Sequence, residues 1–318
     1  MNSIATKVGI DVSKDVLDIY IEREKGRKTL QVPNDLKGIA RLIEELGQGP
    51  HLIALEASGR YEALARHELE DCGYEVRLQN PRLVRRLAQG MGVQAKTDQI
   101  DAKILAQTAE LCAPSQPRSK EREALGDLSR SIGMLKKDRS GHLKRMKVPG
   151  FSKVAAQSLE RLVKAIDKEL LALEKAFVRA AGQSAWAGRY QASLTIPGVG
   201  PHLARCAICE LPENLESWAP RQLASYAGVA PCDDSSGKRI GLSRVSKHGN
   251  AFLKAALYMP AMSLVRCDTW ARQVYRRLRQ KGLTHQQAII PVMRKLLHQV
   301  VAVQKRGSAW QPDPPKRT

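Results

Sequence analysis

The sequence predicts an α/β domain at the N-terminus, a helical hairpin in the middle and a mainly helical domain at the C-terminus of a 318-residue chain. Strand and helix patterns alternate along the first third, which is typical of an α/β sheet. Apolar residues spaced by three and four then continue through residues 119–181, as in a coiled coil. We place the domains at 1–115, 116–182 and 183–307, followed by a disordered tail at 308–318.

The N-terminal elements follow from short local patterns. KVGIDV is apolar, DVLDIYIE alternates with period two and RKTLQVP follows the turn signal EKG, so residues 7–33 predict strands. NDLKGIARLIEELG then predicts a helix that Asn34 caps and Gly47 ends. HLIALEAS predicts a buried strand, YEALARHELEDCG a helix that ends at Gly73, and YEVRLQN a further strand.

The stretch KTDQIDAKILA predicts the next helix, with Thr97 as its cap. Asp98 and Asp101 are three residues apart, so they lie on one face, on the order of 5–6 Å from each other, where like charges repel. Acids in a first turn are also favoured by the helix dipole. The pair therefore indicates either an ordinary helix start or a bound cation.

The middle segment predicts two helical arms separated by KVPGFSK, residues 147–153. Such a hairpin serves as a core element, a dimerisation device or a nucleic-acid arm. A basic cluster on the first arm favours the last two, although charge runs are also common on solvated faces. That cluster comprises Lys136, Lys137, Arg139, Lys144, Arg145 and Lys147. The predicted seam of the second arm comprises Leu159, Leu162, Ile166, Leu170, Leu173 and Phe177.

Charge indicates the class of partner. The chain has 52 Lys and Arg against 32 Asp and Glu, a formal net charge of +20. Between Ser235 and Arg306, fifteen cationic residues accompany one acid, Asp268, which gives this segment a net charge of +14. Such a surface favours a polyanion. Because neither a signal-peptide core nor an apolar run of roughly 20 residues is present, we expect no membrane partner but a cytoplasmic, nucleoid-associated protein that binds DNA or RNA.

Two other kinds of site are not expected. Six scattered cysteines in a long intracellular chain do not predict disulfides, and the CxxC pair Cys206 and Cys209 lacks the further ligands of a zinc site. Four Trp, seven Tyr and three Phe are too few to predict a stacking platform for bases.

Four acids stand at the boundaries of predicted elements. Asp11 ends the first strand and Glu56 a later one, and side chains at the carboxyl ends of central strands converge on one edge of an α/β sheet. Asp98 and Asp101 add a helix start. Clustered carboxylates repel unless they hold cations, and oxygen ligands select Mg²⁺ or Mn²⁺. Two such ions, roughly 4 Å apart, stabilise the attacking and leaving oxygens of a phosphodiester.

The C-terminal part contains two further motifs. LTIPGVGPHLARCAICELP has the form of a helix-hairpin-helix, whose Gly198 and Gly200 turn presents backbone N–H groups to a phosphate; the alternative is an ordinary glycine turn. In SSGKRIGLSRVSKHGN, Ser236 precedes a glycine and several cations that would stabilise a pentavalent phosphate, although a flexible Ser/Gly turn has the same composition. The cations of this segment are Lys238, Arg239, Arg244 and Lys247.

The ordered series GIDVSK, EASG, KTDxxDA and SKHGN resembles the DEDD transposases of the IS one-ten and IS eleven-eleven insertion sequences, which are related to the Piv/MooV site-specific invertases. The resemblance covers nearly the whole chain. It implies a RuvC-like domain with the RNase H fold at the N-terminus and a transposase domain at the C-terminus. It also implies that Asp11, Glu56, Asp98 and Asp101 are the four metal-binding catalytic acids.

The same resemblance assigns a nucleophile and partners. It implies that Ser236 attacks DNA and forms a covalent phosphoserine link, with Ser235 beside it as the other serine of the loop. It further implies a guide non-coding RNA that pairs with donor and target DNA. The acids and Ser236 lie on separate predicted domains joined by a long hairpin and would form one composite site, so assembly from different protomers, as a homodimer or homotetramer, is expected. The expected function is DNA transposition through Mg²⁺-assisted serine attack.

Three alternatives remain open from the sequence. A RuvC-like endonuclease or junction resolvase would use the acids to activate water and would not need Ser236. An RNA-independent DNA invertase would keep both sites but no guide. A protein that only binds nucleic acid would need neither Mg²⁺ nor Asp11.

Overall fold

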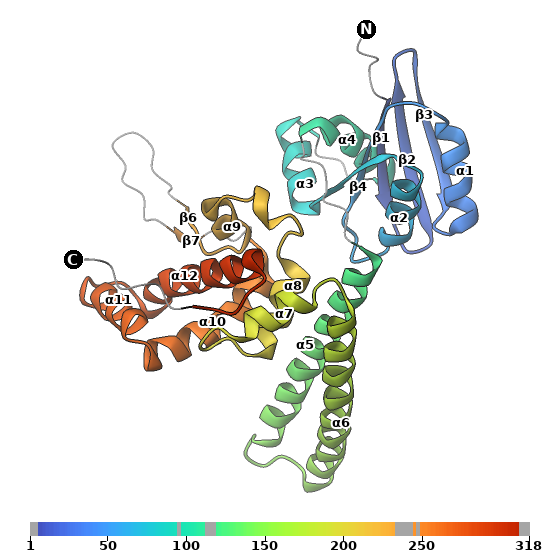
Figure 1. Ribbon diagram of the computed structural model, residues 1–318. Helices are drawn as coiled ribbons and strands as arrows, with labels where there is room; N and C mark the ends of the chain where they lie inside the picture. The colour runs from blue at the N-terminus through green and yellow to red at the C-terminus, as the bar shows by residue number, and fades with distance from the viewer. Residues whose placement is uncertain (1–5, 94–96, 112–118, 233–243, 246–248, 312–318) are drawn as a thin grey trace, which may run out of the picture. The chain divides into compact units, whose positions relative to one another are not determined.

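The computed structural model describes residues 6–93, 97–111, 119–232, 244–245 and 249–311. The chain forms two compact units, residues 1–117 and 118–318, which are considered separately (Figure 1). The boundaries predicted at 115 and 116 lie outside the described residues, and the division into three domains stays a prediction. The described helices include none that combines the length and the hydrophobicity of a membrane span.

The first unit contains a five-stranded mixed sheet with the strand order β3-β2-β1-β4-β5. The first three strands form an antiparallel meander, whereas β4 and β5 run parallel to β1. The expectation of an α/β domain is therefore confirmed. The strands are β1 (Thr6–Val12), β2 (Val16–Arg23), β3 (Gly26–Pro33), β4 (His51–Glu56) and β5 (Glu75–Gln79).

Helices cover both faces of this sheet. Successive side chains of a strand point to opposite faces, and apolar side chains occur on both. Helices α1 (Leu36–Leu46) and α2 (Ala63–Asp71) pack against one face, in a core that includes Ile10 and Ile53. Helices α3 (Pro81–Gly90) and α4 (Asp98–Thr108) lie on the other face, and the 3₁₀ turn η1 (Ala109–Leu111) follows. The candidate acids belong to this second face.

One predicted cap is wrong and one helix had no prediction. Asp35, not Asn34, caps α1, because its carboxylate accepts the Gly38 N–H at 2.8 Å. The Asn34 amide instead donates to the backbone oxygens of Ser13 and Tyr61 at 3.0 Å each, and so ties the β1–β2 turn to the loop after β4. Helix α3 covers residues 81–90, for which no element is predicted from the sequence.

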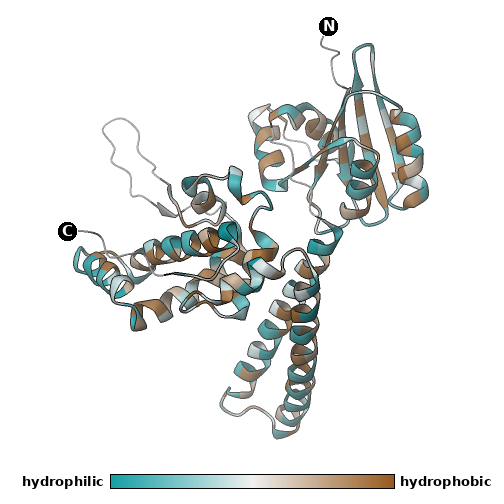
Figure 2. Cartoon of the chain, viewed as in Figure 1, coloured by the Kyte–Doolittle hydropathy of each residue, from teal (hydrophilic) through white to brown (hydrophobic). Residues whose placement is uncertain are grey.

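The predicted hairpin is present in the second unit. Helix α5 (Lys120–Met146) and helix α6 (Lys153–Gln183) are separated by the predicted break, and hydrophobic residues gather where the two arms face each other (Figure 2). The seam differs from the prediction at one position. Leu162 is 48% exposed, whereas Val163 is 7% exposed, so the buried or half-buried seam runs through 159, 163, 166, 170, 173 and 177, which alternate steps of four and three.

The corrected seam predicts that alanine substitutions at the neighbouring positions 162 and 163 change the free energy of unfolding by different amounts. Val163→Ala should lower the free energy of unfolding by about 1 kcal/mol, because it removes buried methyl groups, whereas Leu162→Ala should change it by less than about 0.5 kcal/mol. Urea unfolding of the two variants measures both. Equal costs would contradict the assignment of the seam.

The remaining helices surround α12, which buries residues along most of its length, including Ile289, Leu296 and Val303. Two short strands, β6 (Pro231–Cys232) and β7 (Arg244–Val245), pair antiparallel beside them. The C-terminal part is therefore mainly helical, as predicted. Its helices are α7 (Ala187–Leu194), α8 (Pro201–Glu210), η2 (Leu215–Ser217), α9 (Pro220–Tyr226), α10 (Ala251–Cys267), α11 (Thr269–Gln280) and α12 (His285–Arg306).

Candidate functional site

The sheet register places Asp11 and Glu56 side by side on neighbouring strands. Strand β1 pairs in parallel with β4, and the last pair is Ile10 with Leu55. Asp11 and Glu56 follow that pair directly. Because side chains alternate along strands, both project from the face opposite Ile10 and Leu55. That face is the one covered by α3 and α4, and both acids are half-buried.

A glycine sets the height of α4 above this face. A Cβ atom built on Gly9 would lie 1.9 Å from the backbone oxygen of Ala102 and 2.4 Å from the backbone nitrogen of Ala106. Tyr20, which pairs with Gly9 across β1 and β2, packs against the same two alanines. The helix therefore lies directly on the backbone of β1, two residues before Asp11.

Gly9→Ala should consequently displace α4, which carries Asp98 and Asp101. The added methyl group would clash with backbone that has no rotamer to change, so we expect a loss of about 1–3 kcal/mol in the free energy of unfolding. Thermal unfolding measures this loss. Gly26→Ala is a matched control, since nothing lies within 4 Å of a Cβ atom built there.

The start of α4 agrees with the sequence analysis. The Thr97 hydroxyl accepts the Ile100 N–H at 3.3 Å, and Asp98 and Asp101 both lie in the first turn. Asp101 is half-buried and Asp98 exposed. The favourable helix dipole explains why two acids are tolerated here. It does not explain why they face a third acid.

Asp11 lies within the electric field of this pair. Burial, followed by the negative charges of Asp98 and Asp101, raises the pKa of Asp11 to about 6. A smaller contribution comes from Asp18, the register partner of Asp11 on β2. The structure thus brings Asp11, Asp98 and Asp101 into mutual electrostatic contact, with Glu56 on the next strand of the same face.

Asp18 was missed by the sequence analysis, although a signal was present. Its side chain accepts a hydrogen bond of 2.9 Å from the Gln31 amide on β3. Counting outward from the two-residue turn at residues 14–15, which Ser13 and Val16 close, would have placed it opposite Asp11.

The loop after Glu56 contains a second missed acid. Glu62 is 9% exposed, and its carboxylate accepts the N–H groups of Ser58 at 3.2 Å and Arg60 at 2.8 Å. Arg60 has a φ of 92°, and it is the single described non-glycine residue with a positive φ. Such backbone persists only where surrounding contacts hold it. Glu62 provides these contacts and thereby shapes the loop that leaves Glu56.

The acids are not arranged as a closed ligand shell. Among the residues whose placement is described, no group of three or more His, Cys, Asp or Glu side chains could hold a metal ion in its present arrangement. The donor set nevertheless fits a hard cation, because it consists of carboxylates alone. The raised pKa of Asp11 also reflects repulsion that a cation would relieve.

The glycine motif of the second unit joins two helices. Helix α7 ends before it, Gly198 has a φ of 81°, and Gly200 is the N-cap residue of α8. Gly198 packs toward Leu264 of α10, whose Cδ2 would be 3.2 Å from a Cβ atom. Within the described part of the unit no side chain caps α8. Its first turn is therefore suited to an anion.

The serine segment is described only at its ends. Ser236, its neighbour Ser235, and Lys238, Arg239 and Lys247 lie outside the described residues, as does the side chain of Arg244. The flanking strands pair Pro231 with Val245 and Cys232 with Arg244, so the backbone enters and leaves the segment at one place.

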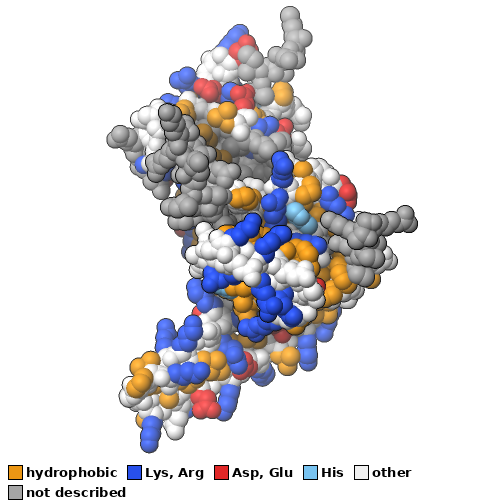
Figure 3. Space-filling view, turned by 90° about the vertical axis from the view of Figure 1, so that its left-hand side faces the viewer, with side chains coloured by type: hydrophobic (Ala, Val, Ile, Leu, Met, Phe, Trp, Pro, Cys, Tyr) orange, Lys and Arg blue, Asp and Glu red, His pale blue; other side chains and the backbone are white. Residues whose placement is uncertain are grey.

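Basic side chains gather on the second unit. In Figure 3, Lys and Arg cover much of the visible face of its helices. The hairpin cluster is partly neutralised across its arms. Lys136 pairs with Glu174 at 2.7 Å, and Arg139 pairs with Asp167 at 2.5 Å. The other four cations of that cluster, Lys137, Lys144, Arg145 and Lys147, are exposed.

Comparison with known proteins places the chain among transposases. A family model for DEDD transposases of IS110, described as a transposase, matches residues 8–148. A second, described as the transposase IS116/IS110/IS902 family, matches residues 190–276. The pilin gene-inverting protein of Moraxella lacunata is 28% identical over 92% of this chain and 93% of its own length. A probable family 20 transposase of Pseudomonas aeruginosa is 24% identical over 82% and 85%, respectively.

The chain is thus an enzyme of the DNA transposase and recombinase class. It belongs to the IS110 family, the IS one-ten family of the sequence analysis. A shorter match agrees with this assignment: the insertion element IS110 uncharacterized 43.6 kDa protein of Streptomyces coelicolor is 31% identical over 37% of this chain and 29% of its own length.

Proposed function

We propose that the chain cuts and rejoins DNA at a composite site, in which the acids of a RuvC-like RNase H-fold unit act together with Ser236. The observation that carries this proposal is the position of Asp11, Glu56, Asp98 and Asp101 on one face of the sheet, covered by α4. This function explains why a chain of net charge +20 keeps repelling carboxylates together.

The four acids would hold Mg²⁺ or Mn²⁺, which when bound neutralises charge on the scissile phosphate. Asp11, whose pKa is raised to about 6, would need to lose its proton before binding a cation. Thr97 fixes the first turn of α4 and Gly9 fixes its height, so these residues position the pair on that helix. Glu62 would hold the loop next to Glu56.

Ser236 would supply the nucleophile. Its Oγ attacks phosphorus, the hydroxyl proton leaves to solvent or a neighbouring base, and the P–O bond to the departing DNA strand breaks. A phosphoserine ester and a free DNA hydroxyl result, so the bond energy is retained for rejoining. Lys238, Arg239 and Arg244 would stabilise the pentavalent state, and Lys247 would contact a phosphate.

The remaining surfaces would grip the nucleic-acid backbone. The α7–α8 turn with Gly198 and Gly200 would act as a helix-hairpin-helix that binds a phosphate. The basic face of the second unit would bind DNA and a guide non-coding RNA, which would delegate sequence recognition to base pairing. The two parts of the site lie in different units, so we further propose a homodimer or homotetramer.

The test is to trap the covalent intermediate. The purified chain is incubated with supercoiled donor DNA and Mg²⁺, with and without the transcript encoded beside its gene, then denatured and digested. A DNA-linked peptide that contains Ser236 supports the proposal. Mg²⁺-dependent nicking without any DNA-linked peptide supports the resolvase alternative, in which water attacks.

Inversion is a second candidate function. The similarity to the pilin gene-inverting protein extends over 92% of this chain, which favours a reaction between two sites of one molecule. A plasmid with two inverted sites distinguishes the reactions. Inversion without added transcript would identify an RNA-independent invertase, whereas transfer to a second plasmid would identify a transposase.

A further inference from the structure

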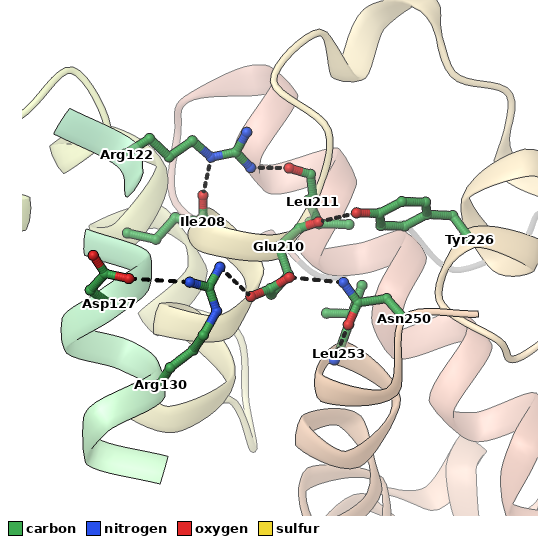
Figure 4. Close-up of polar contacts among 9 residues, drawn as sticks. All are labelled: Arg122, Asp127, Arg130, Ile208, Glu210, Leu211, Tyr226, Asn250 and Leu253. Atoms are coloured by element: carbon green, nitrogen blue, oxygen red, sulfur yellow. Dashed lines mark hydrogen bonds and ion pairs between the residues drawn. The ribbon is translucent and has the colours of Figure 1, made fainter. Parts of the chain in front are cut away.

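A polar network surrounds the C-terminal end of α8, far in sequence from the acids. Arg122 of α5 donates from Nε to the Ile208 oxygen at 2.9 Å and from Nη2 to the Leu211 oxygen. These bonds cap α8 at the residues on either side of Glu210 (Figure 4). Arg122 is 3% exposed, so its guanidinium is a structural group of this junction.

Glu210 is buried, with 7% of its surface exposed, although its side chain is a carboxyl group. One carboxylate oxygen lies 3.7 Å from Nη2 of Arg130 on α5, and the other accepts the Asn250 side-chain N–H at 2.9 Å. A buried carboxylate is strongly unfavourable unless it is paired and hydrogen-bonded. Both conditions are met here, from two different helices.

Asn250 connects this carboxylate to the end of the serine segment. Its Nδ2 donates to Glu210, its Oδ1 accepts the Leu253 N–H at 3.0 Å as the cap of α10, and its backbone N–H donates to the Tyr226 oxygen at 2.7 Å. One residue therefore joins the ends of α8 and α9 to the start of α10. The serine segment of the proposed function ends just before it.

The other end of the segment is fixed at the same place. Gly228, which follows α9, lies so close to Gly249 that a Cβ atom built on Gly249 would be 2.2 Å from the Gly228 Cα atom. Tyr226 also donates from its hydroxyl to the backbone oxygen of Glu210 at 2.6 Å. Both flanks of the segment thus meet on the residue pair Glu210 and Asn250.

We infer that Glu210 is a positioning residue for strand cleavage: through Asn250 it fixes the base of the segment that carries Ser236. This inference rests on the proposed function. Arg130 holds one oxygen of Glu210, so the other remains directed at Asn250. A small displacement of a nucleophile lowers the reaction rate by a large factor. A role in positioning the nucleophile would therefore explain why a carboxyl group is kept at a buried position.

The hydrogen bond can be reversed without removing the cap. Asn250→Asp keeps an oxygen for the Leu253 N–H, because Asp is as good an N-cap as Asn, but it sets a second carboxylate against Glu210. In the double variant Glu210→Gln with Asn250→Asp, the Gln amide can donate to the new Asp. The bond is thereby restored with donor and acceptor exchanged, at the same total charge.

The measurement is single-turnover formation of the covalent adduct on donor DNA, together with DNA affinity and the thermal midpoint. Asn250→Asp should slow adduct formation roughly 10- to 100-fold with DNA affinity nearly unchanged. The double variant should form the adduct at a rate within about threefold of the wild-type rate, since the effects of substitutions at directly bonded residues are not additive. Thr284→Ala, which removes the cap hydroxyl of α12, should lower the midpoint without slowing the reaction.

The outcomes separate the inference from its foundation. If Asn250→Asp reacts at the wild-type rate, or if the double variant recovers its midpoint but not its rate, Glu210 has only a structural role. If Thr284→Ala is slowed as much as Asn250→Asp, general destabilisation explains the effect and the inference is wrong. A wild-type protein that cuts DNA without any adduct overturns the serine mechanism, and the inference with it.

Discussion

Ser236→Ala is expected to abolish the covalent protein–DNA adduct and to slow strand cleavage roughly a thousandfold or more, since the proposed reaction needs this hydroxyl as its nucleophile. DNA affinity should stay within about twofold, because phosphate contacts by Lys and Arg dominate binding. Denaturing gels of labelled donor DNA measure adduct and cleavage, and filter binding at one fixed salt concentration measures affinity.

Ser235→Ala is the matched control, because it removes the adjacent hydroxyl from the same Ser/Gly segment. It should retain the adduct. If Ser235→Ala instead loses the adduct while Ser236→Ala keeps it, the nucleophile is Ser235. Undiminished cleavage by both variants would leave the acids as a water-activating nuclease site.

Asp11→Asn is expected to have an equally large effect on cleavage, roughly a thousandfold or more, because it replaces a charged acid of the proposed metal site. The adduct should be lost together with cleavage, since in the proposed mechanism metal and serine act on the same phosphate. Asp15→Asn is the control: it neutralises an exposed acid in the adjacent turn and should leave cleavage unchanged. A strongly reduced rate in the control would indicate a general charge effect.

The same substitution should stabilise the metal-free protein. The pKa of Asp11 is raised from 3.8 to about 6, so the folded state holds the proton more tightly than the unfolded chain. The contribution of Asp11 to the free energy of unfolding is therefore most favourable below pH 4, falls as the pH rises toward 6, and levels off above it. Asp11→Asn removes that fall and should gain about 1 kcal/mol at pH 7, after discounting for solvent screening of a half-exposed group.

Urea unfolding with EDTA at pH 4.5 and pH 7 measures this difference. Adding Mg²⁺ at pH 7 should raise the thermal midpoint of wild type more than that of Asp11→Asn, because the ion binds only the folded acids. If the variant is less stable than wild type at pH 7, Asp11 makes favourable contacts that outweigh the repulsion.

The N-terminal strands could be predicted because apolar alternation and turn residues marked each one. The α1 cap was assigned to Asn34 because Asn and Asp are equally good N-caps, and only the tertiary contacts to Ser13 and Tyr61 decide between adjacent residues. The seam was displaced at Leu162 for a related reason, since a step of three and a step of four from Leu159 both reach an apolar residue.

The candidate acids were predictable in identity because Asp11 and Glu56 end strands and the pair on α4 starts a helix. Their common face depends on the register of β1 with β4 and on the close approach at Gly9, which pairing and packing determine. Glu210 had no sequence signal, because a glutamate at a helix end is ordinary until its burial and its two partners are known.

Helix α5 is long enough to connect the α8 contacts of Arg122 and Arg130 with a distant part of the hairpin. Arg122 and Arg130 lie near the start of a 27-residue helix, which is about 40 Å long at 1.5 Å per residue. The helix joins the end of α8 to the tip of the hairpin as one stiff rod. Suppose that a molecule bound at the hairpin tip changes the affinity of the protein for a DNA end. Thermodynamic linkage then requires the bound DNA end to change the affinity for that molecule by the same factor.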